Sequence, residues 1–119
     1  MLNVRGNYVL YAHLQPGSVR VVPGQRVRRG DVVGLVGNSG NSIVPHLHVQ
    51  VTSGPSTFAS AGVPYEIDGP YTVTGRTAGG TAAFDRAETD GSVLPVAPFA
   101  PPRLVRNAMP LDQLIVSFP

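Results

Sequence analysis

The sequence predicts an all-β protein, a small antiparallel sandwich or half-barrel with an irregular C-terminal extension. Short stretches of β-branched and aromatic residues recur along the first half, at a spacing that is typical of strands. Fourteen glycines and twelve prolines separate them without a collagen-like period, which favours many turns. No segment has a convincing helical pattern, since the one candidate, residues 103–114, contains Pro110.

The expected strands of the first half follow one another closely. Residues 7–14 are apolar almost throughout, as expected for a strand that is covered on both faces. Shorter strands are expected at 19–22 and 32–37, with turns around them at Pro16–Ser18, Pro23–Gln25 and Arg28–Asp31. A loop of turn-forming residues at 38–42 then leads into a strand at 45–52. Strands and turns at this spacing are typical of a small sandwich or barrel.

The strand expected at 45–52 alternates in polarity. Leu47, Val49 and Val51 would share one face, whereas His46, His48, Gln50 and Thr52 would share the other. Two residues apart on a strand means the same side, with Cα atoms roughly 6–7 Å apart. The imidazoles of His46 and His48 would therefore project into a common space.

The second half is less regular. Short strands are expected at 64–68 and 71–75, after a polar connection at 53–62. Residues 76–92 offer few side chains that would pack, and the four prolines of 95–102 predict a stiff, extended connector. Residues 111–118 are the candidate for a final strand.

Composition excludes several classes of protein. The chain has no cysteine, so neither a disulfide nor a thiolate metal ligand can form. All nine basic residues are arginines, and only Arg26, Arg28 and Arg29 cluster, in what is best explained as a solvated turn. With a net charge of +2, we expect no nucleic-acid partner. We also expect no membrane span and no signal peptide in these 119 residues, and nothing in the sequence fixes an oligomeric state.

The three histidines are the residues most suited to chemistry. A hydrolytic zinc site usually has three His, Asp or Glu ligands and one open position, and neighbouring histidines can transfer protons. His46 and His48 share a face, and His13 could meet them from a neighbouring strand. For a lone histidine an ordinary structural role is the better interpretation. For a His-x-His pair on the polar face of a strand, metal binding or catalysis is favoured.

Four blocks of residues resemble the lysostaphin/LytM-type zinc metallopeptidases, in the same order and at the same spacing. The blocks are Tyr11-Ala12-His13-Leu14, Gly24-Gln25-x-Val27-x-x-Gly30-Asp31-x-x-Gly34, Gly37-Asn38-Ser39-Gly40-Asn41-Ser42 and Pro45-His46-Leu47-His48-x-Gln50-Val51. The resemblance is strong over residues 7–52 and weaker over 62–76. It implies an antiparallel fold of the duplicated hybrid motif type and cleavage of peptide cross-links in peptidoglycan. It also implies work outside the cell or in the cell envelope.

Carried over by position, the resemblance implies a role for each histidine. His48 matches the zinc ligand of the His-x-His pair, whereas His46 and His13 match the two catalytic histidines. The loop from Gly37 to Ser42 would border the substrate groove, although a purely structural hairpin role is an equally good interpretation. The resemblance thus predicts zinc as the cofactor, and peptidoglycan or a peptide as the substrate.

The sequence departs from the family at the metal site. Family members carry two further zinc ligands, a His and an Asp four residues apart, upstream of the Tyr-x-His block. No histidine precedes His13 here, and the first acidic residue, Asp31, fits a turn. We therefore expect residues 1–76 to be a truncated metallopeptidase-like β domain that binds zinc weakly. Residues 77–119 would be an irregular Gly/Pro-rich extension.

Three alternatives remain open at this stage. The three histidines could bind a metal by themselves, although this would occupy the catalytic ones. The chain could be a metal-free binding or activator module of the same family. Finally, residues 21–34 are similar to biotinyl, lipoyl and sugar-phosphotransferase domains. The absence of lysine excludes the biotinyl and lipoyl roles, which leaves a phosphohistidine role for His46 or His48.

Overall fold

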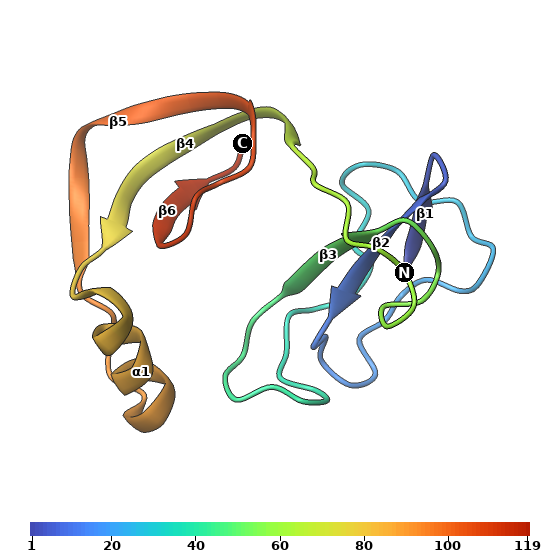
Figure 1. Cartoon of the computed structure of the whole chain (residues 1–119), viewed down its shortest axis with the longest axis horizontal. Helices are drawn as coiled ribbons and strands as arrows, with labels where there is room; N and C mark the ends of the chain where they lie inside the picture. The colour runs from blue at the N-terminus through green and yellow to red at the C-terminus, as the bar shows by residue number, and fades with distance from the viewer. The chain divides into compact units, whose positions relative to one another are not determined.

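A computed structural model describes residues 1–119 as two compact units, Met1–Pro64 and Tyr65–Pro119. Six strands form two three-stranded antiparallel sheets, one in each unit, and the one helix belongs to the second unit (Figure 1). The all-β class predicted from the sequence is therefore confirmed. No helix is long and apolar enough to cross a membrane.

The N-terminal unit is built on strands β1 (Leu2–Val4), β2 (Asn7–Ala12) and β3 (His48–Thr52), in the sheet order β1-β2-β3. Arg5 and Gly6 connect β1 to β2 with φ angles of 53° and 90°. Two consecutive positive φ angles suit the tight turn of a two-residue hairpin, and glycine adopts them without strain. The β2–β3 register runs from Tyr8 opposite Thr52 to Ala12 opposite His48.

The short strands expected at 19–22 and 32–37 do not form in the structure. The two segments are joined by single backbone hydrogen bonds, such as that from Arg20 N–H to the Val33 carbonyl at 3.1 Å. Leu14 and Val36 form only an isolated bridge. β-branched composition alone predicted these strands wrongly, because a strand needs a continuous ladder of partners as well as suitable side chains.

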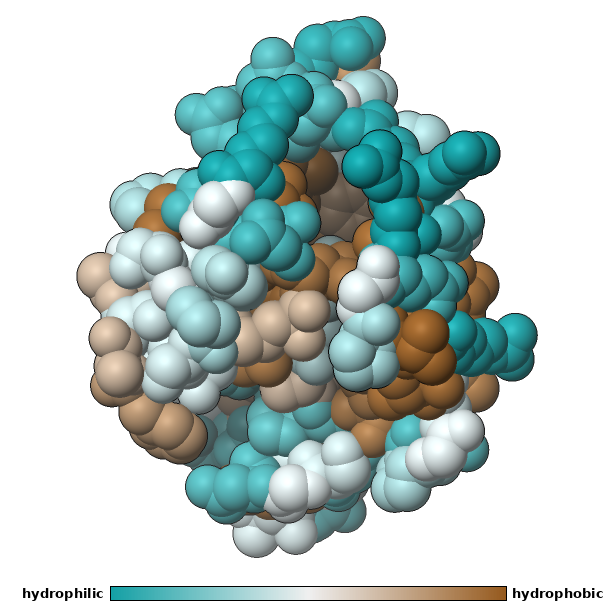
Figure 2. All heavy atoms as spheres, turned by 90° about the vertical axis from the view of Figure 1, so that its right-hand side faces the viewer, coloured by the Kyte–Doolittle hydropathy of each residue, from teal (hydrophilic) through white to brown (hydrophobic).

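The N-terminal unit buries its apolar side chains only in part. Its one fully buried residue is Thr52, whose hydroxyl donates to the Gly54 carbonyl at 2.9 Å. The polar face expected for residues 45–52 therefore turns inward at its C-terminal end. Several valines remain more than half exposed, namely Val19, Val22, Val32 and Val36. Figure 2 shows apolar side chains lying among polar ones on one face of the molecule.

The C-terminal unit contains β4 (Ile67–Thr77), helix α1 (Gly80–Asp90), β5 (Val96–Ala108) and β6 (Leu114–Ser117). Its sheet order is β5-β4-β6, so that β4 is the central strand. The strand expected at 71–75 forms within β4, which begins at Ile67 and pairs irregularly between Ile67 and Pro70, whereas residues 64–66 of the strand expected at 64–68 form no strand. The final strand expected within 111–118 forms as β6.

Residues 77–119 are more regular than the sequence predicted. Helix α1 ends at its C-cap, Gly91, which has a φ angle of 72°. The backbone N–H of Gly91 donates to the Ala87 carbonyl. Glycine in this left-handed conformation is a common helix terminator. Pro98, Pro101 and Pro102 lie in β5, an edge strand, and Pro101 and Pro102 fall between Pro98 and Arg103, a stretch with no partner in β4.

The fully buried apolar side chains belong to the C-terminal unit. Tyr71 and Val73 of β4 are 2% and 4% exposed, and Ala83 of α1 is 3% exposed. The ring of Tyr71 contacts that of Phe118, with centroids 5.9 Å apart. Tyr71 and Val73 form the small core of the sheet, whereas Ala83 is buried within its own segment, beside Gly79.

Candidate active site

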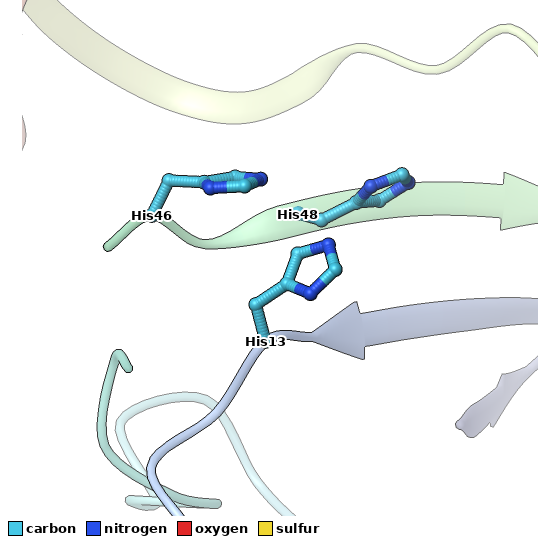
Figure 3. Close-up of side chains that lie close together, drawn as sticks. All are labelled: His13, His46 and His48. Atoms are coloured by element: carbon cyan, nitrogen blue, oxygen red, sulfur yellow. The ribbon is translucent and has the colours of Figure 1, made fainter. Parts of the chain in front are cut away.

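The three histidines of the chain lie together in the N-terminal unit. The ring of His13 lies 4.7 Å from that of His46 and 5.6 Å from that of His48, measured between centroids. One ring nitrogen from each residue lies within 4.8 Å of the other two. Figure 3 shows the His13 ring pointing toward the other two imidazoles. The structure thus brings together all three residues singled out from the sequence.

Strand pairing explains this convergence. Because Ala12 lies opposite His48 in the β2–β3 ladder, the next residue, His13, emerges beside His48. His13 leaves the strand with φ 58°, a left-handed conformation that non-glycine residues seldom adopt. His46 is fixed separately, since its backbone N–H donates to the carbonyl of Gly37 at 3.2 Å.

Backbone carbonyls hold two of the rings. Nδ1 of His13 lies 2.8 Å from the carbonyl oxygen of Ser39, and Nδ1 of His46 lies 2.8 Å from that of Val44. A carbonyl oxygen only accepts hydrogen bonds, so each Nδ1 carries a proton in the neutral ring. The lone pair of each neutral imidazole is therefore on Nε2, where it is available to a metal ion or a proton.

His48 is held more loosely than its neighbours. It is exposed, and its Nε2 lies 3.4 Å from Oε1 of Gln50, the residue two positions along the same strand face. A hydrogen bond of this length is weak, so the ring of His48 can turn at little energetic cost. By contrast, His13 is half-buried.

The loop from Gly37 to Ser42 supports the histidines. Besides accepting from His13, Ser39 donates its hydroxyl to the Leu14 carbonyl at 2.6 Å, and Ser42 Oγ lies 3.2 Å from Nδ1 of His46. The family resemblance implies that this loop borders a substrate groove. The sequence does not predict that the carbonyls of Ser39 and Val44 contact the rings. These contacts use main-chain carbonyls, which every residue type has, so the sequence carried no signal for them.

Asp31 has a structural role in a turn and is not a further metal ligand. Its carboxylate accepts the backbone N–H of Arg28 at 2.8 Å, and its own N–H donates to the Arg28 carbonyl at 3.1 Å. This is the structural role that its position after Gly30 predicts. Asp31 is the one carboxylate side chain in residues 1–64, so the site offers a metal three imidazoles and no acid.

A large groove in the same unit lies elsewhere. It encloses about 710 Å³ between β1 and the segment that precedes the Arg28–Asp31 turn, and its lining includes Leu2, Tyr8, Val21 and Arg26. None of the three histidines lines it. The groove is therefore separate from the histidine cluster, which lies at the surface of the unit.

Three imidazoles on one face of a small β-sheet define a candidate metal-binding and hydrolytic centre. Among known proteins, residues 2–59, just under half of the chain, match peptidase family M23. The chain is also 49% identical over 45 residues to Endolysin 2638A of Staphylococcus phage 2638A, a match that covers 35% of this chain and 9% of that protein. Both matches support the LytM/lysostaphin-type M23 family, a peptidoglycan-hydrolase-like family, for this part of the chain.

The match with the endolysin leaves most of that protein uncovered, since the chain spans about a tenth of its length. No solved structure matches the chain. Family M23 is generally zinc-dependent, and the histidine cluster could hold a metal ion. The spacing of up to 4.8 Å between ligand atoms exceeds the separation of about 3.4 Å that tetrahedral zinc imposes, so these residues fit the ion only after the rings close toward one another.

Proposed function

We propose that the N-terminal unit is a zinc-dependent metalloendopeptidase-like domain directed at the peptide cross-links of peptidoglycan. The convergence of His13, His46 and His48 within the segment matched by family M23 is the observation that carries this proposal. The substrate class follows from the family and from the endolysin match. Such a substrate implies action outside the cell or in the cell envelope.

Each histidine has a role that its contacts support. His48 is the zinc ligand, because it is exposed, loosely held and free to turn toward an ion. His13 and His46 are the catalytic histidines, which accept and return protons at Nε2. Their Nδ1 atoms are held by the carbonyls of Ser39 and Val44, which keeps each Nε2 lone pair directed away from the loop. Zinc, when bound, lowers the pKa of its water to about 7 and polarises the scissile carbonyl.

Residues 1–119 contain one of the three ligands that the family uses, so we expect weak zinc binding and little hydrolysis from them alone. A metal site loses both affinity and geometry with each missing ligand. The chain has no fourth histidine, and its nearest candidate carboxylate, Asp31, is engaged in the Arg28 turn.

This proposal is tested by incubating the chain with purified peptidoglycan and zinc. Cosedimentation measures binding, and the appearance of new amino groups measures peptide cleavage. We expect cosedimentation, with amino-group release close to that of the blank. Any release above the blank should disappear with a chelator and in His48→Ala. Nanomolar zinc binding that is lost in His48→Ala would contradict the expected weak site, and a failure to cosediment would contradict the substrate class.

A metal-free binding or activator module of the same family is the second candidate. The observation that favours it is the absence of carboxylate ligands around the histidines. Cosedimentation of His46→Ala and His48→Ala separates the two candidates. Binding that survives both substitutions favours the module. Binding that weakens in both variants indicates that the imidazoles contact the substrate, as in a hydrolase.

A further inference from the structure

We propose that Ser39 is the positioning residue for His13, because its side chain and its main chain both bind the short stretch that carries this imidazole. The inference rests on the proposed function, in which His13 accepts and returns a proton at Nε2. It names the group that holds the ring in the form able to do so. The metal ion takes no part in it.

His13 needs support from outside its own strand. Strand β2 ends at Ala12, and His13 follows it with a φ angle of 58°. A non-glycine residue seldom adopts this left-handed conformation, and it persists where the surrounding structure holds it. The pairing of β2 with β3 does not do so, since the ladder ends with Ala12 opposite His48. The conformation of His13 therefore depends on contacts with another segment of the chain.

Ser39 supplies two short hydrogen bonds to this stretch. Its hydroxyl donates to the carbonyl of Leu14 at 2.6 Å, and its own carbonyl accepts the Nδ1–H of His13 at 2.8 Å. Both contacts are partly buried, and they join residues that are 25 and 26 positions apart in the chain. Because the hydroxyl anchors Ser39 to the main chain beside His13, it also fixes the place of the carbonyl that meets the ring.

Glycines on both sides of Ser39 let the loop come this close. A Cβ at Gly37 would lie 2.5 Å from the backbone N of Gln15, and one at Gly40 would lie 3.9 Å from Nδ1 of His13. Gly40 also has a φ angle of 74°, a conformation that glycine adopts without strain. Ser39 thus lies between two positions at which the loop approaches residues 13–15, so its contacts are part of the packing of two chain segments.

The consequence for His13 is a fixed tautomer. In a neutral imidazole, the hydrogen bond made by one ring nitrogen decides which nitrogen carries the proton. With Nδ1–H donated to Ser39, the lone pair of His13 is on Nε2, the atom that the proposed reaction uses. His46 is held differently, since its acceptor is the carbonyl of Val44, two positions before it in the chain. Loss of the Ser39 hydroxyl should therefore change the tautomer of His13 and not that of His46.

The test is Ser39→Ala in the full chain, with nitrogen-15 magnetic resonance of the imidazoles at a pH where they are neutral. We expect the ratio of the Nδ1–H to the Nε2–H form of His13 to fall about fivefold, the effect of one net hydrogen bond. The ratio for His46 should stay the same. Ser39→Thr keeps the hydroxyl and should keep the original ratio for His13. Ser56→Ala is the matched control, since the hydroxyl of Ser56 accepts one backbone N–H, that of Ala59 at 3.2 Å, and contacts no histidine.

An unchanged His13 tautomer in Ser39→Ala would overturn the proposal, and so would a Ser39→Thr protein that behaves like Ser39→Ala. Amide spectra show whether each variant is folded. If Ser39→Ala does not fold, the exchange of ring N–H protons with water in the unsubstituted chain decides. Slower exchange at Nδ1 of His13 than at Nδ1 of His46 supports the proposal, whereas equal or faster exchange overturns it. None of these measurements uses peptidoglycan or zinc, so this inference and the proposed function fail separately.

Discussion

Gly37→Ala is expected to destabilise the N-terminal unit severely and to separate His13 from His46. A Cβ at Gly37 would lie 2.5 Å from the backbone N of Gln15 and 2.6 Å from its Cα. Neither atom can move aside by a side-chain rotation, so the chain at Gln15 must shift. That shift breaks the hydrogen bond from Gln15 N–H to the Leu35 carbonyl, now 2.8 Å long. We expect a loss of about 3 kcal/mol or more in the free energy of unfolding.

Gly62→Ala is the matched control in the same unit. No heavy atom lies within 4 Å of the position that its Cβ would take, and its φ angle is not positive. The free energy of unfolding should therefore change by no more than about 0.5 kcal/mol. Urea unfolding followed by residue-resolved amide spectra reports the N-terminal unit separately. If Gly37→Ala unfolds at the same urea concentration as Gly62→Ala, the close approach of Gly37 to Gln15 is wrong.

Val73→Ala is expected to destabilise the C-terminal unit by about 2 kcal/mol, because it removes two methyl groups from a buried site. Val73 is 4% exposed at the centre of β4, beside Tyr71, which is 2% exposed. A unit of this size has a free energy of unfolding of about 3–8 kcal/mol, so the loss is a large fraction of the total. Unfolding of this unit can be followed by residue-resolved amide spectra of β4 and β5, which pair with each other around Val73.

Val93→Ala is the same substitution at a site that is 93% exposed. Nothing is lost there by truncation, and the free energy of unfolding should be unchanged within about 0.5 kcal/mol. Equal effects of the two substitutions would mean that Val73 is not part of a packed core. A large effect of Val73→Ala alone supports the core described for β4.

The sequence predicted the parts of the fold that depend on local pattern. The apolar run at residues 7–14 forms β2, and the alternation at 45–52 forms β3 from His48 onward. The convergence of the histidines followed from two expectations, that His46 and His48 share a face and that a neighbouring strand carries His13. Both expectations depend on side-chain periodicity and on the pairing of neighbouring strands, which the sequence pattern predicts.

Other features depend on partners distant in sequence, and the pattern missed them. Helix α1 has few apolar residues and buries one of them, Ala83, beside Gly79, which the pattern of residues 79–91 does not predict. The prolines of β5 suggested a connector, because the sequence does not show that this strand lies at a sheet edge. Likewise, the carbonyls that hold His13 and His46 come from main-chain atoms.

The central claim is that three imidazoles face one another in the N-terminal unit, with His13 and His46 protonated on Nδ1. Nuclear magnetic resonance of the ring protons and nitrogens tests it directly at a pH where the rings are neutral. The account predicts nuclear Overhauser effects from the His13 ring to the rings of His46 and His48, whose centroids lie 4.7 and 5.6 Å away. It also predicts the Nδ1–H tautomer for His13 and His46. Rings without mutual Overhauser effects, or with the proton on Nε2 in both residues, would contradict it.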